Sequence, residues 1–264
     1  FNIQSLTEFS SSPESEFWIF LALFLGFAVK LPMLPFHTWL PDAHSEAPTG
    51  GSVLLAGVLL KMGGYGLIRF CLPIFPEMAH SFAPAVLWLS VLGILYGGYM
   101  ALAQTDLKRL VAYSSISHMG FVTLGIFSFN NEGIAGATLQ MVTHGITTGA
   151  MFLIVGQLYD RTHSREIADY GGLQARMPRF VAVLSLFAVA SFGLPTTSNF
   201  IGEFLILVGV SYQNFLFVVM AMGGIVLGAA YMLWTVSYTH LRAHEPFAHL
   251  VCRRRLDKGG GGGG

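Results

Sequence analysis

Charged side chains are scarce in this sequence. Asp, Glu, Lys and Arg together make up 11% of the 264 residues, and the formal net charge is zero. A water-soluble domain carries about a quarter charged residues, so this chain has too little polar surface to cover a soluble globule. A net charge of zero also gives no reason to expect nucleic acid as a partner.

Cysteine is rare as well. Cys71 and Cys252 lie far apart and form no Cys-x-x-Cys pair, which leaves a disulfide framework, an iron–sulfur ligand set and a zinc site without support. No glycine-rich nucleotide-binding loop stands between a strand and a helix. We therefore expect neither a cofactor nor a bound metal in this chain.

Apolar residues dominate instead. They make up 53% of the chain, the mean hydropathy is +0.62, and phenylalanine and glycine are abundant, as in helices that pack within lipid. A helix needs about 20 mostly apolar residues to cross a bilayer. The sequence therefore predicts an all-α, polytopic transmembrane helix bundle of about seven spans. The expected spans are residues 16–40, 51–72, 84–104, 107–128, 133–158, 179–210 and 214–235.

The two ends of the sequence differ from the rest. Phe1 is not an initiator residue, which indicates that the chain begins inside a longer protein. From Val236 the share of apolar residues falls. The residues that follow resemble a translated sequencing adapter, and the chain ends in six glycines. A basic, flexible tail with a glycine linker is the alternative. We therefore divide the chain into a membrane domain, 1–235, and a non-native tail, 236–264.

Nine basic residues precede residue 236; Lys30 and Lys61 lie deep in spans, and the other seven are unevenly distributed. Six of them lie in or directly beside two connections, 105–109 and 159–178, whereas Arg69 alone lies toward the opposite side. Positive residues favour the cytoplasmic side of a membrane. The two connections are therefore expected on the same side, facing the cytoplasm or the matrix of an organelle.

Two of the expected spans are interrupted. The first contains Pro32 directly after Lys30 and Leu31, and the sixth contains Gly193 and Pro195 followed by residues of helix-capping type. Proline removes a backbone donor and clashes with the preceding turn. Broken backbone within a membrane is tolerated only where protein or a wet cavity meets its hydrogen bonds, and paired broken helices are typical of transporters.

Lys30 is the most informative residue of the sequence. It lies deep in the first span, where a charged lysine costs on the order of 3 kcal/mol and low dielectric favours the neutral form. We interpret it as a proton-transfer group whose charge a neighbouring group can switch, because the helix breaks beside it. A lysine held in a fixed ion pair is the alternative.

Four further ionisable residues lie within other spans: Lys61, His118, His144 and Glu203. Histidine titrates nearest neutrality and can shuttle protons, although a lone buried histidine is commonly just a hydrogen-bonded core residue. Glu203 follows the second break. The alternative to a role in proton transfer is a carboxylate that hydrogen bonds hold to the backbone. Together with Lys30, these groups predict a lateral proton-transfer path, which requires neighbours within reach of a hydrogen bond or a water.

A polar cluster lies at the edge of the first span, formed by His37, Asp42, His44 and Glu46. These residues resemble metal ligands by type, but their spacing matches no standard site. We interpret them as an interfacial loop with capping roles, and as a candidate point of proton uptake.

Long motifs in the chain resemble a known family. The run Phe36-His-Thr-Trp-Leu-Pro-Asp-Ala-His-Ser-Glu-Ala-Pro-Thr-Gly-Gly-Ser-Val, continuing to Leu67, is similar to chain M of proton-pumping NADH:quinone oxidoreductase (respiratory complex I), the mitochondrial subunit 4 type. The runs 106–120 and 199–204 support the resemblance, which covers residues 17–234.

The resemblance implies two inverted half-channels, each with a broken helix, of which this chain would hold the second. By that resemblance Lys30 is the central lysine, Lys61 the connecting lysine, and His118 and His144 the linking histidines. Glu203 takes the terminal position, where related subunits often carry lysine. The carboxylate that pairs with Lys30 would lie upstream of the first residue. The family chain holds no flavin, iron–sulfur cluster or quinone site of its own.

The sequence therefore predicts a membrane-arm subunit of NADH:quinone oxidoreductase that carries protons, coupled to quinone reduction elsewhere in the complex. The expected partners are the other membrane-arm subunits, the lipid bilayer, protons and internal water. The expected location is the bacterial plasma membrane, or the mitochondrial inner membrane. A subunit of a multi-chain cation/proton antiporter is the alternative, and a structural scaffold is disfavoured because apolar residues would serve one better than buried lysines.

Overall fold

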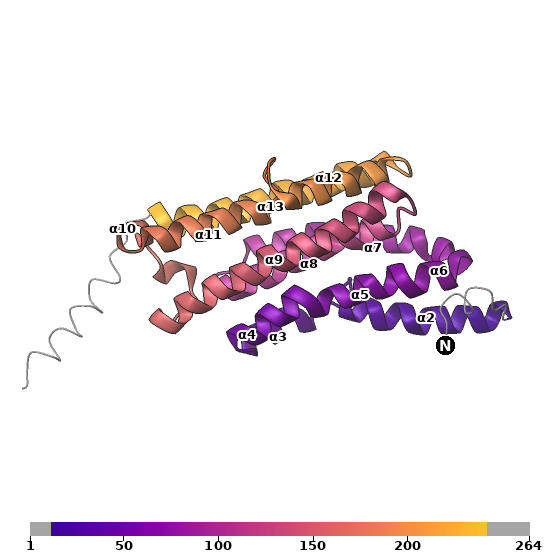
Figure 1. Cartoon of the computed structure of the whole chain (residues 1–264), viewed down its shortest axis with the longest axis horizontal. Coiled ribbons are helices and arrows are strands. Elements are labelled where there is room, and N and C mark those ends of the chain that lie inside the picture. Colours follow the sequence, from indigo (N-terminus) through magenta and orange to yellow (C-terminus); the bar gives the residue numbers. More distant parts are fainter. Residues whose placement is uncertain (1–11, 242–264) are drawn as a thin grey trace, which may run out of the picture.

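The chain folds into helices that run roughly alongside one another, along the long axis of the molecule (Figure 1). The structure, a computed structural model, describes residues 12–241, with side chains to residue 239, and confirms the all-α prediction. The elements in chain order are α2 Pro13–Lys30, α3 Trp39–Glu46, α4 Thr49–Leu54, η1 Leu55–Leu59, α5 Leu60–Gly66, η2 Leu67–Cys71, α6 Leu72–Ile74, α7 Pro76–Leu102, α8 Leu107–Ile126, α9 Asn131–Thr162, η3 Ile167–Asp169, α10 Leu173–Arg176, α11 Pro178–Ser191, α12 Ser198–Ser211 and α13 Phe215–Leu241.

The predicted non-native tail, 236–264, lies outside the described residues from residue 242 onward. Its first residues continue the last helix, α13, which ends at Leu241.

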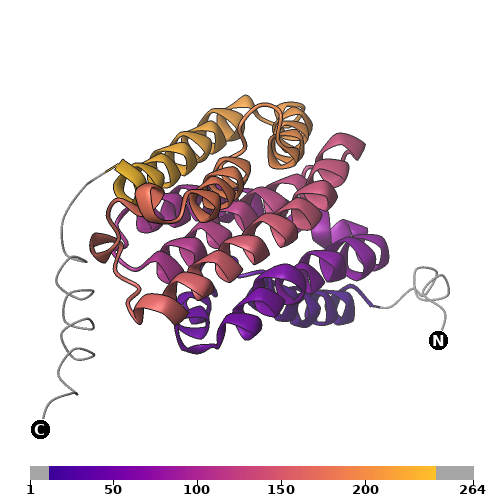
Figure 2. The same cartoon turned by 60° about the vertical axis from the view of Figure 1, so that its left-hand side comes forward.

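The centre of the bundle is α8. It packs against α7, α9 and α12, and all of its residues from 114 to 126 are buried. Figures 1 and 2 show α2 to α6 along one side of α8 and α9, with α11, α12 and α13 along the other. Polar side chains on α8 must therefore find their hydrogen-bond partners inside the protein.

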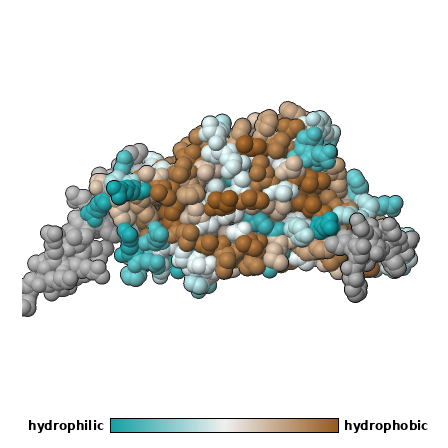
Figure 3. Space-filling view, in the orientation of Figure 1, coloured by the Kyte–Doolittle hydropathy of each residue, from teal (hydrophilic) through white to brown (hydrophobic). Residues whose placement is uncertain are grey.

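The outer surface of the bundle is apolar. Figure 3 shows hydrophobic residues across the middle of the molecule and hydrophilic residues gathered toward its two ends. Large apolar side chains such as Leu54, Ile146 and Leu186 are more than 60% exposed. Soluble proteins rarely expose contiguous apolar surface on this scale, so the middle of the molecule faces lipid or other membrane chains.

Within residues 12–241, four helices are long and apolar enough to cross a membrane, judged by length and composition: Thr49–Ile74, Pro76–Leu102, Asn131–Thr162 and Phe215–Thr239. The predicted count of seven spans is therefore not confirmed. The expected sixth span consists of two shorter apolar helices, α11 and α12, of 14 residues each. At about 1.5 Å per residue, neither reaches across a hydrocarbon core of about 30 Å by itself.

The two basic connections lie at the same end of the bundle, as the charge distribution predicts. The backbone N–H of Leu107 donates to the carbonyl of Arg165 at 3.0 Å, and that of Ile167 donates to the carbonyl of Thr105 at 2.8 Å. Arg69 lies in η2, which adjoins α6 at the opposite end (Figure 1).

Both predicted interruptions are present. α2 ends at Lys30 and helix resumes at Trp39. The indole N–H of Trp39 donates to the carbonyl of Val29 at 3.0 Å, which satisfies one of the acceptors that a helix end leaves free. Residues 192–197 separate α11 from α12 in the same way.

The helix that carries Lys61 contains two π-helical stretches, η1 and η2, which lie on either side of α5. The sequence did not predict them. Single π-helical turns are rare and occur frequently at functional sites. They mark this helix as irregular close to Lys61, although no proline interrupts residues 49–72.

α2 and α5 touch backbone to backbone beside Lys30. A Cβ atom at Gly63 would lie 2.9 Å from the backbone nitrogen of Leu31 and 2.9 Å from the carbonyl oxygen of Phe27. Both are backbone atoms at the end of α2, Phe27 in its last turn and Leu31 directly after it, so they cannot rotate away as a side chain would. Glycine at this position therefore sets how closely the two lysine-bearing helices approach.

We expect Gly63→Ala to lower the free energy of unfolding by about 1–3 kcal/mol, because the added methyl group forces two helix backbones apart. Thermal or denaturant unfolding of the full-length protein in detergent measures the change. Gly57→Ala is the matched control: its Cβ would meet only the carbonyl oxygen of Gly145, at 3.8 Å, and alanine favours helix. Equal losses in the two variants would contradict the close approach.

Candidate functional site

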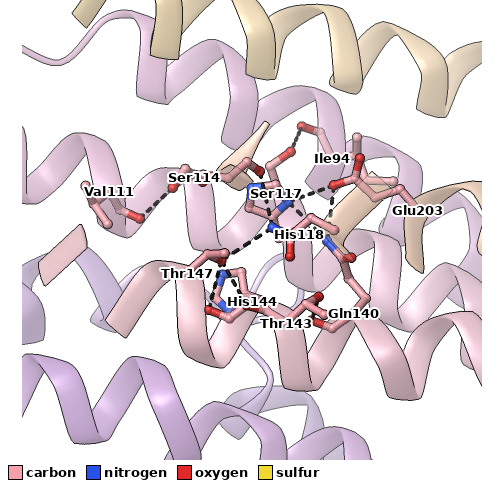
Figure 4. Close-up of polar contacts among 12 residues, drawn as sticks. Ile94, Val111, Ser114, Ser117, His118, Gln140, Thr143, His144, Thr147 and Glu203 are labelled. Atoms are coloured by element: carbon pink, nitrogen blue, oxygen red, sulfur yellow. Dashed lines mark hydrogen bonds and ion pairs between the residues drawn. The ribbon is translucent and has the colours of Figure 1, made fainter. Parts of the chain in front are cut away.

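Four of the five predicted site residues form a line through the bundle, and each comes from a different helix. Lys61 Nζ on α5 lies 2.7 Å from His144 Nδ1 on α9. The rings of His144 and His118, on α8, meet edge to face with their centroids 5.4 Å apart. His118 Nδ1 lies 3.2 Å from Glu203 Oε1 on α12. Figure 4 shows His118 between Glu203 on one side and His144 on the other.

The line is closed at one end and partly open at the other. His144, His118 and Glu203 are each less than 5% exposed, whereas Lys61 is half-buried. Lys61 Nζ also donates to the carbonyl of Ala56, in η1. The π-helical stretch thus supplies a main-chain acceptor for the ammonium group, and the imidazole of His144 supplies a second partner.

Several buried polar atoms on α8, α9 and α12 have no hydrogen-bond partner among the described residues. His118 Nε2 and His144 Nε2 are both buried without a protein partner, and so are the hydroxyl of Thr148 and the side-chain carbonyl oxygen of Asn199. Buried polar atoms are ordinarily hydrogen-bonded, by water where the protein offers no partner. Water is therefore the expected partner of both Nε2 atoms.

Gln140 is a member of the site that the sequence did not predict. Its side-chain N–H donates to Glu203 Oε1 at 3.1 Å and lies 3.5 Å from His118 Nδ1. It is fully buried. Because Gln140 precedes His144 by four residues, the two side chains share one face of α9. That spacing could have placed Gln140 in the site, but a neutral amide in an apolar span does not by itself indicate a functional residue.

The break between α11 and α12 lies directly against Glu203. Gly193 has a φ of +71°, and a Cβ atom there would lie 2.7 Å from Glu203 Oε2. The side-chain amide of Asn199 donates at 3.4 Å both to the carbonyl of Ser191, the last residue of α11, and to the hydroxyl of Thr147. The break thus makes room for the carboxylate and ties both half-helices to α9.

Lys30 does not join this line. It is the last residue of α2 and its side chain is exposed, and residues 12–241 offer it no hydrogen-bond or ion-pair partner. Within the described residues, the line from Lys61 to Glu203 therefore does not include Lys30. The reason is that its face of α2, with Trp18 and Val29 also exposed, is covered by nothing in the described part of the chain. A role for Lys30 in proton transfer stays a prediction.

The polar cluster at the edge of the first span is divided between surface and core. Asp42 forms an exposed ion pair with Arg109 at 3.0 Å. His44 is fully buried and stacks on Phe152 with the ring centroids 4.3 Å apart. Burial, aided by the charges of Lys108 and Lys61, lowers the pKa of His44 to about 3, so this ring is neutral near pH 7. Among the described residues, no three His, Cys, Asp or Glu side chains gather as metal ligands would.

Lys61 lines a groove of about 630 Å³ between the helix that carries it and α9. The rest of the lining is almost wholly apolar, with Leu54, Val58, Met62 and Ile146 strongly exposed. The groove places the half-buried end of the ionisable line at the outer surface of the bundle.

Comparison with known proteins identifies relatives of this sequence. The sequence model of the family described as NADH:quinone oxidoreductase/Mrp antiporter, TM, matches residues 1–228. NADH-quinone oxidoreductase subunit M of Rickettsia bellii is 55% identical over 212 residues, which are 80% of this chain and 43% of that protein. This chain thus spans less than half the length of that relative.

Two solved structures are similar in fold. A chain of respiratory complex I from Thermus thermophilus with bound NADH matches 92% of this chain, and 52% of its own length, with a TM-score of 0.87 and 37% identity. A chain of the Mrp complex from Dietzia sp. matches 84% of this chain, and 41% of its own length, with a TM-score of 0.77 and 20% identity. The second likeness concerns the fold alone.

We expect Gly193→Ala to destabilise the protein more than the left-handed backbone alone explains. That backbone costs a residue with a Cβ about 1–2 kcal/mol, and here the methyl group would also press on the carboxylate of Glu203. Gly172→Ala is the matched control, because Gly172 has a φ of +63° and open space around its Cβ position. Unfolding of the full-length variants measures the difference; equal losses would show that Gly193 is needed for its backbone only.

Proposed function

Because this chain belongs to the NADH:quinone oxidoreductase/Mrp antiporter family of membrane proteins, we propose that it is part of a membrane-arm subunit of proton-pumping NADH:quinone oxidoreductase, of the subunit M type. In this role it carries protons while quinone reduction takes place elsewhere in the complex. The support is the high identity with subunit M, against a likeness to the Mrp complex that is limited to fold.

The observation that carries this proposal is the series of titratable groups from Lys61 to Glu203. Lys61 and His144 share a hydrogen bond, so a proton can pass between ammonium and imidazole within that contact. His118 and Glu203 share a second one. The two imidazoles share no hydrogen bond in the described residues; in our proposal, water bound to the unpartnered Nε2 atoms would complete the path. A structural bundle would place apolar residues at these positions.

Gln140 keeps the inner end of the path in order. Its amide N–H holds Glu203 Oε1 beside His118 Nδ1, and the amide does not titrate. It therefore fixes the geometry of the acceptor without competing for the proton. We assign Gln140 a positioning role and assign proton transfer to Lys61, His144, His118 and Glu203.

Lys30 enters the proposal through the contact between α2 and α5. The backbone of Leu31, next to Lys30, lies against Gly63, two residues from Lys61. In our proposal the exposed face around Lys30 is covered by an upstream segment that supplies the pairing carboxylate. The charge of Lys30 would then bias the proton affinity of Lys61.

The remaining parts of the proposal follow from the same family membership. The chain carries protons without a cofactor or redox centre of its own, and its partners are the other membrane-arm subunits of complex I, the lipid bilayer and internal water. Its location is the bacterial plasma membrane, or the mitochondrial inner membrane if the protein is organellar. The end of the bundle with the two basic connections faces the cytoplasm or the matrix.

The alternative function is a subunit of a multi-chain cation/proton antiporter of the Mrp kind, which shares the fold. The genes beside the source gene distinguish the two functions. Genes for redox subunits alongside it support complex I, and genes for antiporter subunits alone would overturn the assignment.

We expect Lys30→Ala in the full-length protein to lower the rate of proton pumping coupled to NADH oxidation by about tenfold or more, since a positioned proton-transfer group contributes on that scale. Lys30→Arg should also impair pumping, because arginine keeps the charge but does not readily release its proton. Proton uptake per NADH oxidised is measured in the assembled complex. Unchanged stoichiometry and rate would remove Lys30 from the mechanism.

We expect His144→Gln to reduce proton pumping by a similar factor, because glutamine can hydrogen-bond to Lys61 but cannot carry a proton at neutral pH. His80→Gln is the matched control: His80 is exposed on α7 and stacks on Phe129, away from the line. Normal pumping in an assembled complex with His144→Gln would remove the line of ionisable groups from the proposal.

A further inference from the structure

A second polar site lies at the end of the bundle that carries the basic connections. It is a surface pocket of about 390 Å³ between the end of α9 and the start of α11, lined by Arg161, Met177, Pro178, Arg179 and Phe180. The lining contains two guanidinium groups and no acidic residue. Its other three members are apolar, so the pocket combines positive charge with a hydrophobic wall.

The two arginines of this pocket are free to bind a ligand. Arg161 Nη1 is 3.1 Å from the sulfur of Met177, a weak acceptor, and neither Arg161 nor Arg179 forms an ion pair with a described acidic residue. Their basic neighbours are engaged instead. Arg165 donates to the carbonyl of Ser45 and lies over the ring of Tyr159, and Arg109 pairs with Asp42.

An apolar surface continues from the pocket along α11. Val183 is 45% exposed and Leu186 is 64% exposed, on a helix of 14 mostly apolar residues that starts at the pocket with Pro178. Figure 1 shows α11 running from the end marked by α10 toward the middle of the bundle. The start of a helix also carries partial positive charge from its free N–H groups.

We propose that this pocket binds the phosphate headgroup of an anionic phospholipid, with an acyl chain lying along α11. Guanidinium groups match the oxygens of a phosphate diester in geometry and charge, and the long arginine stems can lie along apolar surface while their heads stay at the membrane boundary. The site lies at the polar end of the molecule, where headgroups are found. An anionic lipid fits better than a zwitterionic one, because the lining offers no carboxylate to a headgroup amine.

The occupant is a lipid and not a free phosphate ion, because the lining is more apolar than polar. Met177, Pro178 and Phe180 would face a small ion without contributing a hydrogen-bond donor from their side chains. They offer the glycerol and upper acyl carbons of a lipid an apolar contact that water does not. The lipid would bridge α9 and α11 and so fix the start of the half-helix that leads to the break beside Glu203.

The test uses the full-length protein in its assembled complex, reconstituted in nanodiscs of phosphatidylcholine with a minor share of phosphatidylglycerol. A photoreactive phenylalanine analogue replaces Phe180, and mass spectrometry identifies the lipids that cross-link to it. We expect phosphatidylglycerol to be enriched above its share of the bilayer. Arg161→Gln and Arg179→Gln should each lower that enrichment about fivefold, the value of one basic residue near an anionic surface.

Arg176→Gln is the matched control, because Arg176 is exposed in the same connection but does not line the pocket. We expect it to leave the enrichment unchanged, and we expect added inorganic phosphate not to compete. Phosphatidylglycerol at its bulk share would overturn the proposal, as would cross-linking to a peptide of a neighbouring subunit. An equal loss in Arg176→Gln would contradict the proposal, because it would show diffuse attraction to anionic lipid in place of a defined site. Full competition by phosphate would contradict it too, because it would show a pocket for a free anion.

Discussion

The burial of ionisable groups among apolar helices constrains the rest of this structure. A polar atom buried without a partner costs about 1–3 kcal/mol, and an unpaired charge costs more. His144, His118 and Glu203 come from three different helices and are almost completely buried, so α9, α8 and α12 must keep a single register for these groups to meet. Turning one helix by a single residue, about 100°, would leave each of its neighbours without a partner. The polar line therefore specifies the packing of the bundle that encloses it.

Irregular backbone gathers at the two ends of that line. At one end the π-helical stretch η1 brings the carbonyl of Ala56 to Lys61, and at the other the break at Gly193 leaves space for the carboxylate of Glu203. A regular helix uses its carbonyls internally and presents a Cβ at every position except glycine. Departures from regular helix thus lie where a buried ionisable group needs a main-chain partner or space. Packing alone would favour regular helix at these positions.

The sequence predicts the helices and both interruptions because apolar length, proline and glycine act locally. It also predicts four members of the polar line, since an ionisable residue in an apolar span is costly enough to stand out. Gln140 escapes prediction because a neutral amide does not stand out, and η1 and η2 escape because no residue type marks a π-helical turn in residues 49–72. The exposure of Lys30 depends on which segments cover α2, and local sequence carries no information about that. The count of seven spans is not confirmed: the expected sixth span is divided between α11 and α12, and neither α2 nor α8 is among the four described helices long and apolar enough to cross a membrane.

The exposed position of Lys30 and the enclosed position of the line can be reconciled by electrostatics. Gly63 brings α5 against the end of α2, and the two lysines lie within two residues of that contact on their respective helices. The interaction between two charges falls only as the inverse of their separation and is stronger where the surroundings are apolar. No hydrogen bond between the lysines is needed for one to influence the other. A segment that covers Lys30 and sets its charge would act on the line at Lys61, the member that is half-buried and opens to the groove. The line would therefore be gated at its open end, while Glu203, held by Gln140 and the break, closes the other.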